Sequence, residues 1–214
     1  MRIAVVGATG WLGGAVTREA LARGHEVTAV GRSADRLAAL EGVSTVSADA
    51  TDPVALAGAI AGHDAVVMAV TDRSGPERSV IPAAARSVIE AAPRAGVERV
   101  AFVGGGGSLA SPAGGRYVDQ PGFPEQYKAE ALAQGDALAL FRAAPEELDW
   151  TYLSPPPHNL EPGEKRGGYR AAAGENPVVA RDGESRITSG DLAAAMLDAL
   201  EGREFSRQRF TVGY

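Results

Sequence analysis

A glycine-rich segment near the start of the chain has the spacing of a pyrophosphate-binding loop. The segment is Gly7-Ala8-Thr9-Gly10-Trp11-Leu12-Gly13, between a short apolar run and a sequence of helical composition. In a strand–turn–helix unit the first glycine allows a sharp turn, the second lets the backbone approach the phosphates, and the third allows close helix packing. Free N–H groups at the helix N-terminus then stabilise the negative charge of the phosphates. An ordinary tight turn is the alternative. The residues expected to bind a dinucleotide here are Gly7, Thr9, Gly10, Trp11, Leu12 and Gly13.

Two arginines follow the second predicted strand, where a dinucleotide site recognises the ribose. Arg32 comes directly after the strand and Arg36 follows four residues later. A guanidinium at this point can pair with a 2′-phosphate, whereas an NAD-specific site places an acid there. The pattern favours NADP(H) over NAD(H), with a pair of solvated surface arginines as the alternative.

Four residues at other strand ends are assigned to the same cofactor. Asp49 and Ala50 follow the third predicted strand, where a carboxylate suits a hydrogen bond to adenine. A turn or helix-capping aspartate is the alternative, because Thr51-Asp52-Pro53 comes next. Ala69 and Val70 end the fourth predicted strand.

These motifs resemble the atypical branch of the short-chain dehydrogenase/reductase superfamily. More narrowly, the chain is similar to the NmrA-like NAD(P)H-binding family, which includes NADH-flavin reductases and the flavin reductase also called biliverdin-IXβ reductase. The resemblance spans nearly the whole chain and implies a Rossmann fold and an NAD(P)H-dependent oxidoreductase whose flavin is a substrate rather than a bound cofactor. Its C-terminal markers are Leu153-Ser154-Pro155-Pro156-Pro157-His158, Gly168-Tyr169-Arg170 and the segment 183–192.

The catalytic pair usual in this superfamily is incomplete. The family places Tyr-x-x-x-Lys on the helix after the fifth strand, and Lys128 matches the lysine. Pro124 stands at the tyrosine position, and Tyr127 is adjacent to Lys128 and does not share its helical face. Alcohol dehydrogenase and sugar-nucleotide epimerase chemistry are therefore disfavoured. Lys128 is expected to bind ribose hydroxyls, with a solvated helix lysine as the alternative.

The resemblance also implies a serine and a histidine near the substrate. In flavin reductases a serine follows the fifth strand and a histidine follows a Pro-Pro segment, and Ser108 and His158 match these places. Ser108 is expected to hydrogen-bond nicotinamide or substrate, and His158 to donate or relay a proton near neutral pH. A loop serine and a structural histidine are the alternatives.

Glycines, prolines and aromatic residues in the two longest loops are expected to shape the site. Gly104 and Gly105 bring the loop backbone close to the nicotinamide ring, unless the glycine run serves only flexibility. Pro155 and Pro156 form a wall beside that ring. Four aromatic residues are suited to stacking on a planar substrate: Tyr117, Phe123, Tyr127 and Tyr169. For each of them, ordinary packing within the protein is the alternative.

Composition excludes several other classes of protein. The 214 residues contain no cysteine, which excludes disulfides, thiolate zinc sites and cysteine nucleophiles, and three separated histidines favour no metal site. A net charge of −6 argues against nucleic-acid binding. Apolar runs of about six residues, such as Ala65–Val70, are far below the roughly 20 that span a bilayer. We expect a cytoplasmic monomer or homodimer that acts on a small planar substrate.

The elements that position these residues alternate along the chain. Buried-type strands separated by helical segments indicate one doubly wound α/β domain over residues 1–214 with a parallel sheet, whose carboxyl edge binds the ligands. Segments at about 104–125 and 154–190 are expected to cover the substrate. Within them, long irregular stretches are expected at 104–122 and from the end of the strand Asp149–Leu153 up to about Pro177. The predicted strands are Arg2–Val6, Glu26–Val30, Val43–Ser47, Ala65–Val70, Arg99–Val103, Asp149–Leu153 and Arg209–Val212. The predicted helices are Trp11–Arg23, Ala34–Glu41, Pro53–Ala61, Glu77–Ala95, Glu125–Ala144 and Asp191–Glu201, the last with Ser189 or Asp191 near its cap.

Three functions remain open. The first is hydride transfer from NADPH to a flavin or another planar acceptor. The second is a redox sensor that binds NADP(H) without turnover. The third is a nucleotide-sugar epimerase or dehydratase.

Overall fold

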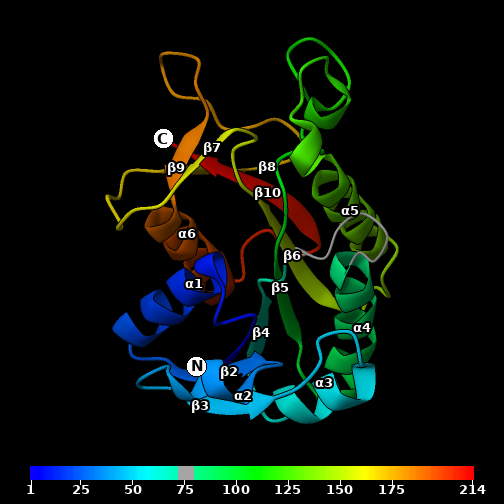
Figure 1. Cartoon of the computed structure of the whole chain (residues 1–214), viewed down its shortest axis with the longest axis vertical. Coiled ribbons are helices and arrows are strands. Elements are labelled where there is room, and N and C mark those ends of the chain that lie inside the picture. The colour runs from blue at the N-terminus through cyan, green and yellow to red at the C-terminus, as the bar shows by residue number, and fades with distance from the viewer. Residues whose placement is uncertain (72–79) are drawn as a thin grey trace.

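The computed structural model describes residues 1–71 and 80–214. Its strands are β1 (Arg2–Val6), β2 (Glu26–Gly31), β3 (Ser44–Ser47), β4 (Ala65–Met68), β5 (Arg99–Val103), β6 (Asp149–Ser154), β7 (Asn159–Glu161), β8 (Arg170–Ala173), β9 (Arg186–Thr188) and β10 (Gln208–Gly213). Among the described residues, an eight-stranded sheet in the order β3-β2-β1-β4-β5-β6-β10-β8 forms the centre of the molecule (Figure 1). Strands β7 and β9 form a separate two-stranded parallel sheet.

The central sheet is parallel except at one edge. All neighbouring pairs from β3 to β10 are parallel, and β8 joins β10 in the antiparallel direction. The strand order reverses between β1 and β4, because β2 and β3 lie to one side of β1 and β4, β5 and β6 to the other. This reversal leaves a crevice at the carboxyl ends of the strands, where doubly wound proteins bind their ligands.

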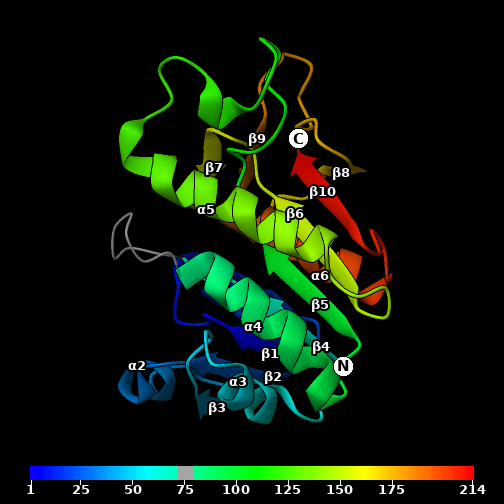
Figure 2. The same cartoon turned by 90° about the vertical axis from the view of Figure 1, so that its right-hand side faces the viewer.

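Helices cover both faces of the sheet. They are α1 (Trp11–Ala22), α2 (Ala34–Ala38), α3 (Pro53–Ile60), α4 (Val80–Ala95), α5 (Glu125–Arg142) and α6 (Ser189–Glu201), with a short 3₁₀ helix, η1 (Tyr117–Asp119). Helices α1 and α6 pack together on one face, and α3, α4 and α5 follow one another across the other (Figures 1 and 2).

Each face of the sheet has its own hydrophobic core. One cluster joins the sheet to α3, α4 and α5 and includes Leu56, Phe102 and Phe141. The other joins it to α1 and α6 and includes Val16 and Met196. Strands β4 and β5 are buried at every position, which explains their continuous apolar sequences.

The predicted α/β fold with its mostly parallel sheet is confirmed, and the N-terminal strands and helices agree to within a few residues. Pro53 is the first residue of α3, after an Asp52 carboxylate that accepts the backbone N–H groups of Val54 and Ala55. Of the predicted helix Glu77–Ala95, the first three residues lie outside the described residues.

One prediction for the C-terminal part is wrong. The segment expected to be irregular up to about Pro177 contains β7 and β8, which are short and have little apolar pattern. The N-cap of α6 is Thr188, whose hydroxyl accepts the backbone N–H of Asp191 at 3.2 Å, so Ser189 and Asp191 lie near the cap as predicted. Short paired strands depend on tertiary neighbours more than on local sequence.

Over residues 1–71 and 80–214, no helix has the length and apolar character needed to cross a membrane. The cytoplasmic location stays a prediction.

Candidate functional site

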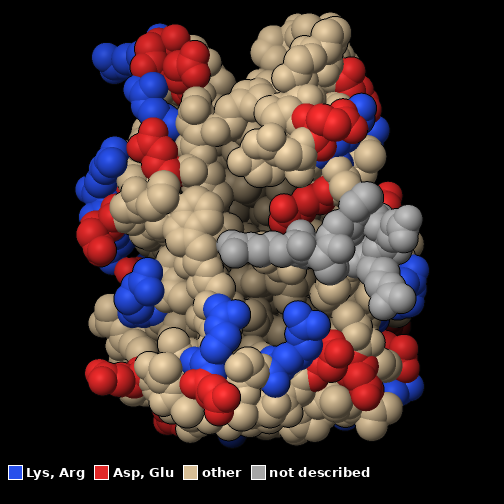
Figure 3. Space-filling view, viewed as in Figure 1, with Lys and Arg blue, Asp and Glu red and all other residues tan. Residues whose placement is uncertain are grey.

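The carboxyl ends of β1 to β6 meet at one edge of the sheet. The predicted phosphate loop, Arg32, Asp49, Ala69 and the segment 104–108 all follow these strands and therefore lie along this edge. This edge is turned towards the viewer in Figure 3, where the surface is hollowed between the α1–α6 side and the α4–α5 side. Lys and Arg side chains lie along the lower rim of the hollow.

The phosphate loop is pressed against the neighbouring backbone. Gly7 has a φ of +87°, and its N–H donates to the carbonyl of Val30 at 2.9 Å. A Cβ on Gly7 would lie 2.3 Å from the carbonyl oxygen of Ala69, and one on Gly13 would lie 2.1 Å from the carbonyl oxygen of Gly7. Two of the three glycines are therefore required by the fold itself.

The middle glycine differs from the other two. Gly10 precedes α1 as its N-cap in an extended conformation and has no side chain to cap the helix. Among the described residues, a Cβ there would contact only the Gly7 carbonyl oxygen, at 3.1 Å. The first turn of α1 contains no acidic residue, and Trp11 beside it is exposed while Leu12 is half-buried. The free N–H groups of this turn and the open approach over Gly10 fit a pyrophosphate.

Arg32 and Arg36 lie on the side of the loop where the ribose is expected. The guanidinium Nη2 of Arg36 donates to the carbonyl of Thr9 at 2.8 Å, so Arg36 directly contacts the phosphate loop. The exposed Arg32 acts electrostatically on Asp49, and its carbonyl accepts the hydroxyl of Ser47 at 3.3 Å. The fold therefore brings two cations to the end of the phosphate loop.

Asp49 is held in a local turn. Its Oδ1 accepts both the backbone N–H of Thr51, at 2.9 Å, and the Thr51 hydroxyl, at 2.8 Å. The hydrogen bond from the Thr51 backbone holds the pKa of Asp49 below its usual value. Ala50 is half-buried beside it. The turn role is thus present, and an adenine contact through the other carboxylate oxygen stays a prediction.

Packing within the protein leaves no room for side chains at several glycines after β5. A Cβ on Gly104 would collide with the ring of Tyr152, at 1.9 Å from Cε1, and one on Gly105 would press on Gln134 at 3.0 Å. A Cβ on Gly106 would meet the Pro155 carbonyl oxygen at 2.6 Å. These contacts account for the glycines by packing rather than by flexibility. An approach to the nicotinamide ring stays a prediction.

The two predicted covering segments contact each other. The ring of Tyr117 packs edge-on against the ring of His158, with centroids 5.3 Å apart and an interplanar angle of 77°. Phe123 lies beside Gly107, at 3.6 Å from the position of a Cβ there. Pro155 and Pro156 are buried at the end of β6, and His158 after them is exposed. The backbone N–H of Tyr117 donates to the carbonyl of Leu109 at 3.0 Å, next to Ser108. Ser108, Tyr117, Phe123 and His158 therefore belong to one region.

Three predicted site residues lie outside this region or face solvent. Tyr127 is 57% exposed on the first turn of α5. Lys128 is also exposed and lies 3.7 Å from the carboxylate of Glu125. The Tyr169 hydroxyl donates to Asp198. Asp198 also accepts a hydrogen bond from Arg23, the C-cap of α1. From the rise of the helix, Arg23 lies about 20 Å from the phosphate loop at the other end of α1.

A buried arginine near Ser108 was missed by the sequence analysis. Arg209, on β10, donates to the Ser108 hydroxyl oxygen at 3.1 Å and to the Ser154 hydroxyl oxygen at 2.8 Å. Arg209 was noted there only as the first residue of a predicted strand. The available signal was an arginine at the start of the strand Arg209-Phe210-Thr211-Val212, because an arginine in a buried strand needs partners.

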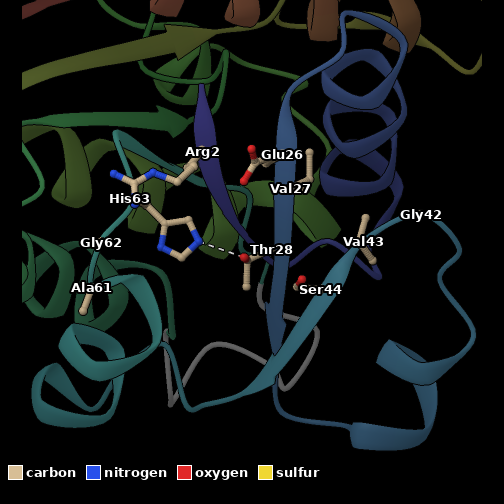
Figure 4. A pocket seen from close by; sticks show the side chains of 10 residues that line it. All are labelled: Arg2, Glu26, Val27, Thr28, Gly42, Val43, Ser44, Ala61, Gly62 and His63. Atoms are coloured by element: carbon tan, nitrogen blue, oxygen red, sulfur yellow. Dashed lines mark hydrogen bonds between the residues drawn. The ribbon is translucent and has the colours of Figure 1, made fainter.

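A hollow of about 590 Å³ lies at the opposite edge of the sheet, where β1, β2 and β3 begin (Figure 4). Its lining is mostly polar and includes His63, whose Nε2 is hydrogen-bonded to the hydroxyl of Thr28 at 2.8 Å. The predicted site residues are not part of its lining. Within residues 1–71 and 80–214, no group of His, Cys, Asp and Glu is arranged to hold a metal ion.

Comparisons with known proteins agree with the phosphate loop. Residues 7–203 match the family described as NAD(P)H-binding. A crystal structure from Burkholderia pseudomallei named "putative exported protein" is 39% identical, covers 100% of both chains and has a TM-score of 0.87. A "putative epimerase" from Bacteroides thetaiotaomicron is 34% identical over 100% of this chain and 96% of that one, with a TM-score of 0.88. A "putative NADH-flavin reductase" from Streptococcus pneumoniae is 32% identical over 100% of this chain and 99% of that one, with a TM-score of 0.83. The chain therefore belongs to the NAD(P)H-binding family, whose cofactor is a nicotinamide dinucleotide.

Substitution of Gly10 separates cofactor binding from folding. Gly10→Val places a side chain over the free N–H groups of α1, so the dissociation constant for NADPH should rise by more than about tenfold, or ~1.4 kcal/mol. The fold should survive, since only one tight contact is formed. Gly13→Ala is the matched variant: its Cβ meets a backbone carbonyl at 2.1 Å, so it should lower the melting temperature clearly. Fluorescence titration and thermal unfolding measure both effects, and unchanged NADPH affinity in a folded Gly10→Val protein would contradict the assignment.

Proposed function

We propose that this member of the NAD(P)H-binding family is an NADPH-dependent reductase that passes a hydride to a flavin or another planar acceptor. The observation that best supports the proposal is the surface of α5. Pro124 is the N-cap of this helix, and it stands where a catalytic phenol would precede Lys128. Tyr127 and Lys128 are both exposed, and Lys128 pairs with Glu125. A reaction that needs a strong acid aimed at a carbonyl or sugar oxygen is poorly served by this arrangement.

The other side of the site suits an acceptor that needs position more than protonation. Ser108 supplies a hydroxyl, and the edge-on rings of Tyr117 and His158 supply an apolar surface with a polar tip. Such rings stack on flat conjugated molecules and exclude water from them. A flavin ring takes up the charge of the hydride within its own conjugated system. The protein then contributes mainly orientation and electrostatics.

The residues proposed to hold the cofactor follow the carboxyl edge. The N–H groups at the start of α1 bind the pyrophosphate, Arg32 and Arg36 bind a 2′-phosphate, and Asp49 accepts from adenine. Bound NADPH supplies the hydride and both electrons of the reduction. Backbone atoms of Gly104 and Gly105 and the prolines after β6 orient the nicotinamide side.

A panel of acceptors tests the proposal. Purified protein is mixed with NADPH and with FMN, FAD, riboflavin, biliverdin or quinones, and the loss of reduced-nicotinamide absorbance is followed. We expect turnover with planar acceptors. Tight NADPH binding without oxidation by any acceptor would instead identify a sensor, and turnover of nucleotide sugars alone would identify an epimerase-like enzyme.

Arg32→Asp tests the preference for NADP(H). The substitution removes a charge-assisted contact with the 2′-phosphate and adds repulsion, so NADPH binding should weaken by about 1.5–3 kcal/mol. NADH binding should change far less, because NADH lacks the 2′-phosphate. Isothermal titration with each cofactor measures the difference, and equal losses for both would show that Arg32 does not recognise the phosphate.

His158→Ala tests the proton requirement of the acceptor. The rate of reduction of an acceptor that is protonated in the transition state should fall by about 10²–10⁴-fold. Reduction of a flavin should slow much less, since water can protonate the flavin after the hydride arrives.

Tyr127→Phe keeps the aromatic ring and removes only the phenol hydroxyl, so steady-state rates should change little. Complete loss of activity in Tyr127→Phe would identify Tyr127 as a displaced catalytic acid and contradict the reductase proposal.

A further inference from the structure

Arg209 is a buried cation that contacts Ser108, in the region where the acceptor is proposed to bind. It lies on β10 with only 2% of its side chain exposed. Its Nε donates to the Ser154 hydroxyl oxygen at 2.8 Å, and its Nη2 donates to the Ser108 hydroxyl oxygen at 3.1 Å. Its Nη1 donates to the Ser108 carbonyl at 3.2 Å and to Glu175 at 2.8 Å. Four of the five guanidinium N–H groups are thus used to hold β6 and both covering segments together.

The charge of Arg209 is only partly balanced. Glu175 is the carboxylate that it contacts, and this side chain is 48% exposed. Glu175 also forms an ion pair with Arg142, so two guanidinium groups share one carboxylate. In the described part of the chain, the ion-pair cluster behind Ser108 therefore contains two guanidinium groups and one carboxylate. Burial in a low-dielectric region makes the field of such a charge stronger than it is in water.

The contact with Arg209 also determines how Ser108 can hydrogen-bond. A guanidinium only donates, so the Ser108 oxygen is the acceptor and its hydroxyl proton must point elsewhere. Within residues 1–71 and 80–214, no oxygen takes that proton. Ser154 has the same relation to Arg209 but is fully buried, whereas Ser108 is half-buried at the edge where the acceptor is expected. Ser108 is thus a donor with a cation directly behind it.

We propose that Arg209 is a positioning residue that acts through Ser108, so that the Ser108 hydroxyl donates to the negative charge that hydride transfer places on the acceptor. The inference rests on the proposed reductase function. The acceptor gains a hydride as a C–H bond of the reduced nicotinamide breaks, and it keeps one extra negative charge until a proton from water neutralises it. The oxidised nicotinamide carries the matching positive charge. A polarised donor aimed at a developing anion lowers the barrier of such a step.

Variants of Ser108 and Arg209 test the inference in the full-length protein. Ser108→Ala should lower kcat for flavin reduction by about 10²-fold, with little change in KM. Arg209→Lys keeps the positive charge but loses the planar guanidinium that donates to both serine hydroxyl oxygens, and it should lower kcat by about tenfold. Because Arg209 acts through Ser108, the double variant should be no slower than Ser108→Ala alone.

Arg99→Lys is the matched control. Arg99 is the first residue of β5, at the end of the strand away from the site, and is 1% exposed. It donates to Asp149 and to the backbone carbonyls of Ala199 and Glu204. It reports the general effect of replacing a buried arginine by lysine. If Arg209→Lys and Arg99→Lys lower kcat equally, or if Arg209→Lys and Ser108→Ala are additive, the inference is wrong. If Arg209→Lys does not fold, Ser108→Ala and the binding measurement below decide.

Binding of one ligand in two charge states supplies a readout besides turnover. Oxidised lumiflavin is neutral, and anaerobically reduced lumiflavin is an anion at alkaline pH. The wild-type protein should bind the reduced form about tenfold more tightly, and Ser108→Ala and Arg209→Lys should lose that preference. Equal affinities in the wild type would overturn the inference. Absence of turnover with every planar acceptor would overturn the proposed function and the inference with it, whereas turnover that is insensitive to Ser108→Ala overturns the inference alone.

Discussion

Direct contact between backbone groups at the end of β1 determines the geometry of the cofactor side. Gly7 and Gly13 have no room for a side chain, because the carbonyls of Ala69 and of Gly7 itself occupy that space. This contact lets β1 turn directly into α1 while remaining against β4, so the N-terminus of α1 points along the carboxyl edge of the sheet. Gly10 is free of that packing and leaves the N–H groups of the helix open. Recognition of an anion here therefore depends on backbone dipoles that the fold has already aligned.

The two sides of the site use positive charge differently. On the cofactor side, Arg32 and Arg36 are exposed, and Arg36 is tied to the carbonyl of Thr9. Exposed guanidinium groups can move to meet a phosphate and are screened by salt. On the side proposed for the acceptor, Arg209 is buried and held by four hydrogen bonds. Because a buried charge cannot reach a ligand, we propose that it acts through Ser108, which is half-exposed.

Packing also explains why the loop after β5 is rich in glycine. Gly104 and Gly106 lie against Tyr152 and against the backbone of Pro155 and Pro157, so β5 and β6 remain close beyond the end of the sheet. The Tyr152 hydroxyl donates to the carbonyl and side-chain oxygens of Gln134 on α5, and burial raises the pKa of this phenol. The loop that presents Ser108 is thus supported by a strand, a helix and a buried hydroxyl. Such support is what a site needs to keep a donor in a constant position.

The alternation of strands and helices along the chain and the position of the glycine-rich loop could both be predicted from the sequence. Apolar runs that alternate with helical segments predict a parallel sheet, and Gly7, Gly10 and Gly13 predict the turn, because both signals are local and depend on residue type and spacing. Which of the predicted residues meet depends on the tertiary structure. The fold brings the loop that carries Ser108 beside Tyr117, packs Tyr117 against His158, leaves Tyr127 and Lys128 exposed, and holds Tyr169 against Asp198. It also adds Arg209, which is 101 residues from Ser108 in sequence. The pairing of a buried guanidinium with distant hydroxyl groups follows from the strand order of the folded sheet, and no local pattern in the sequence encodes it.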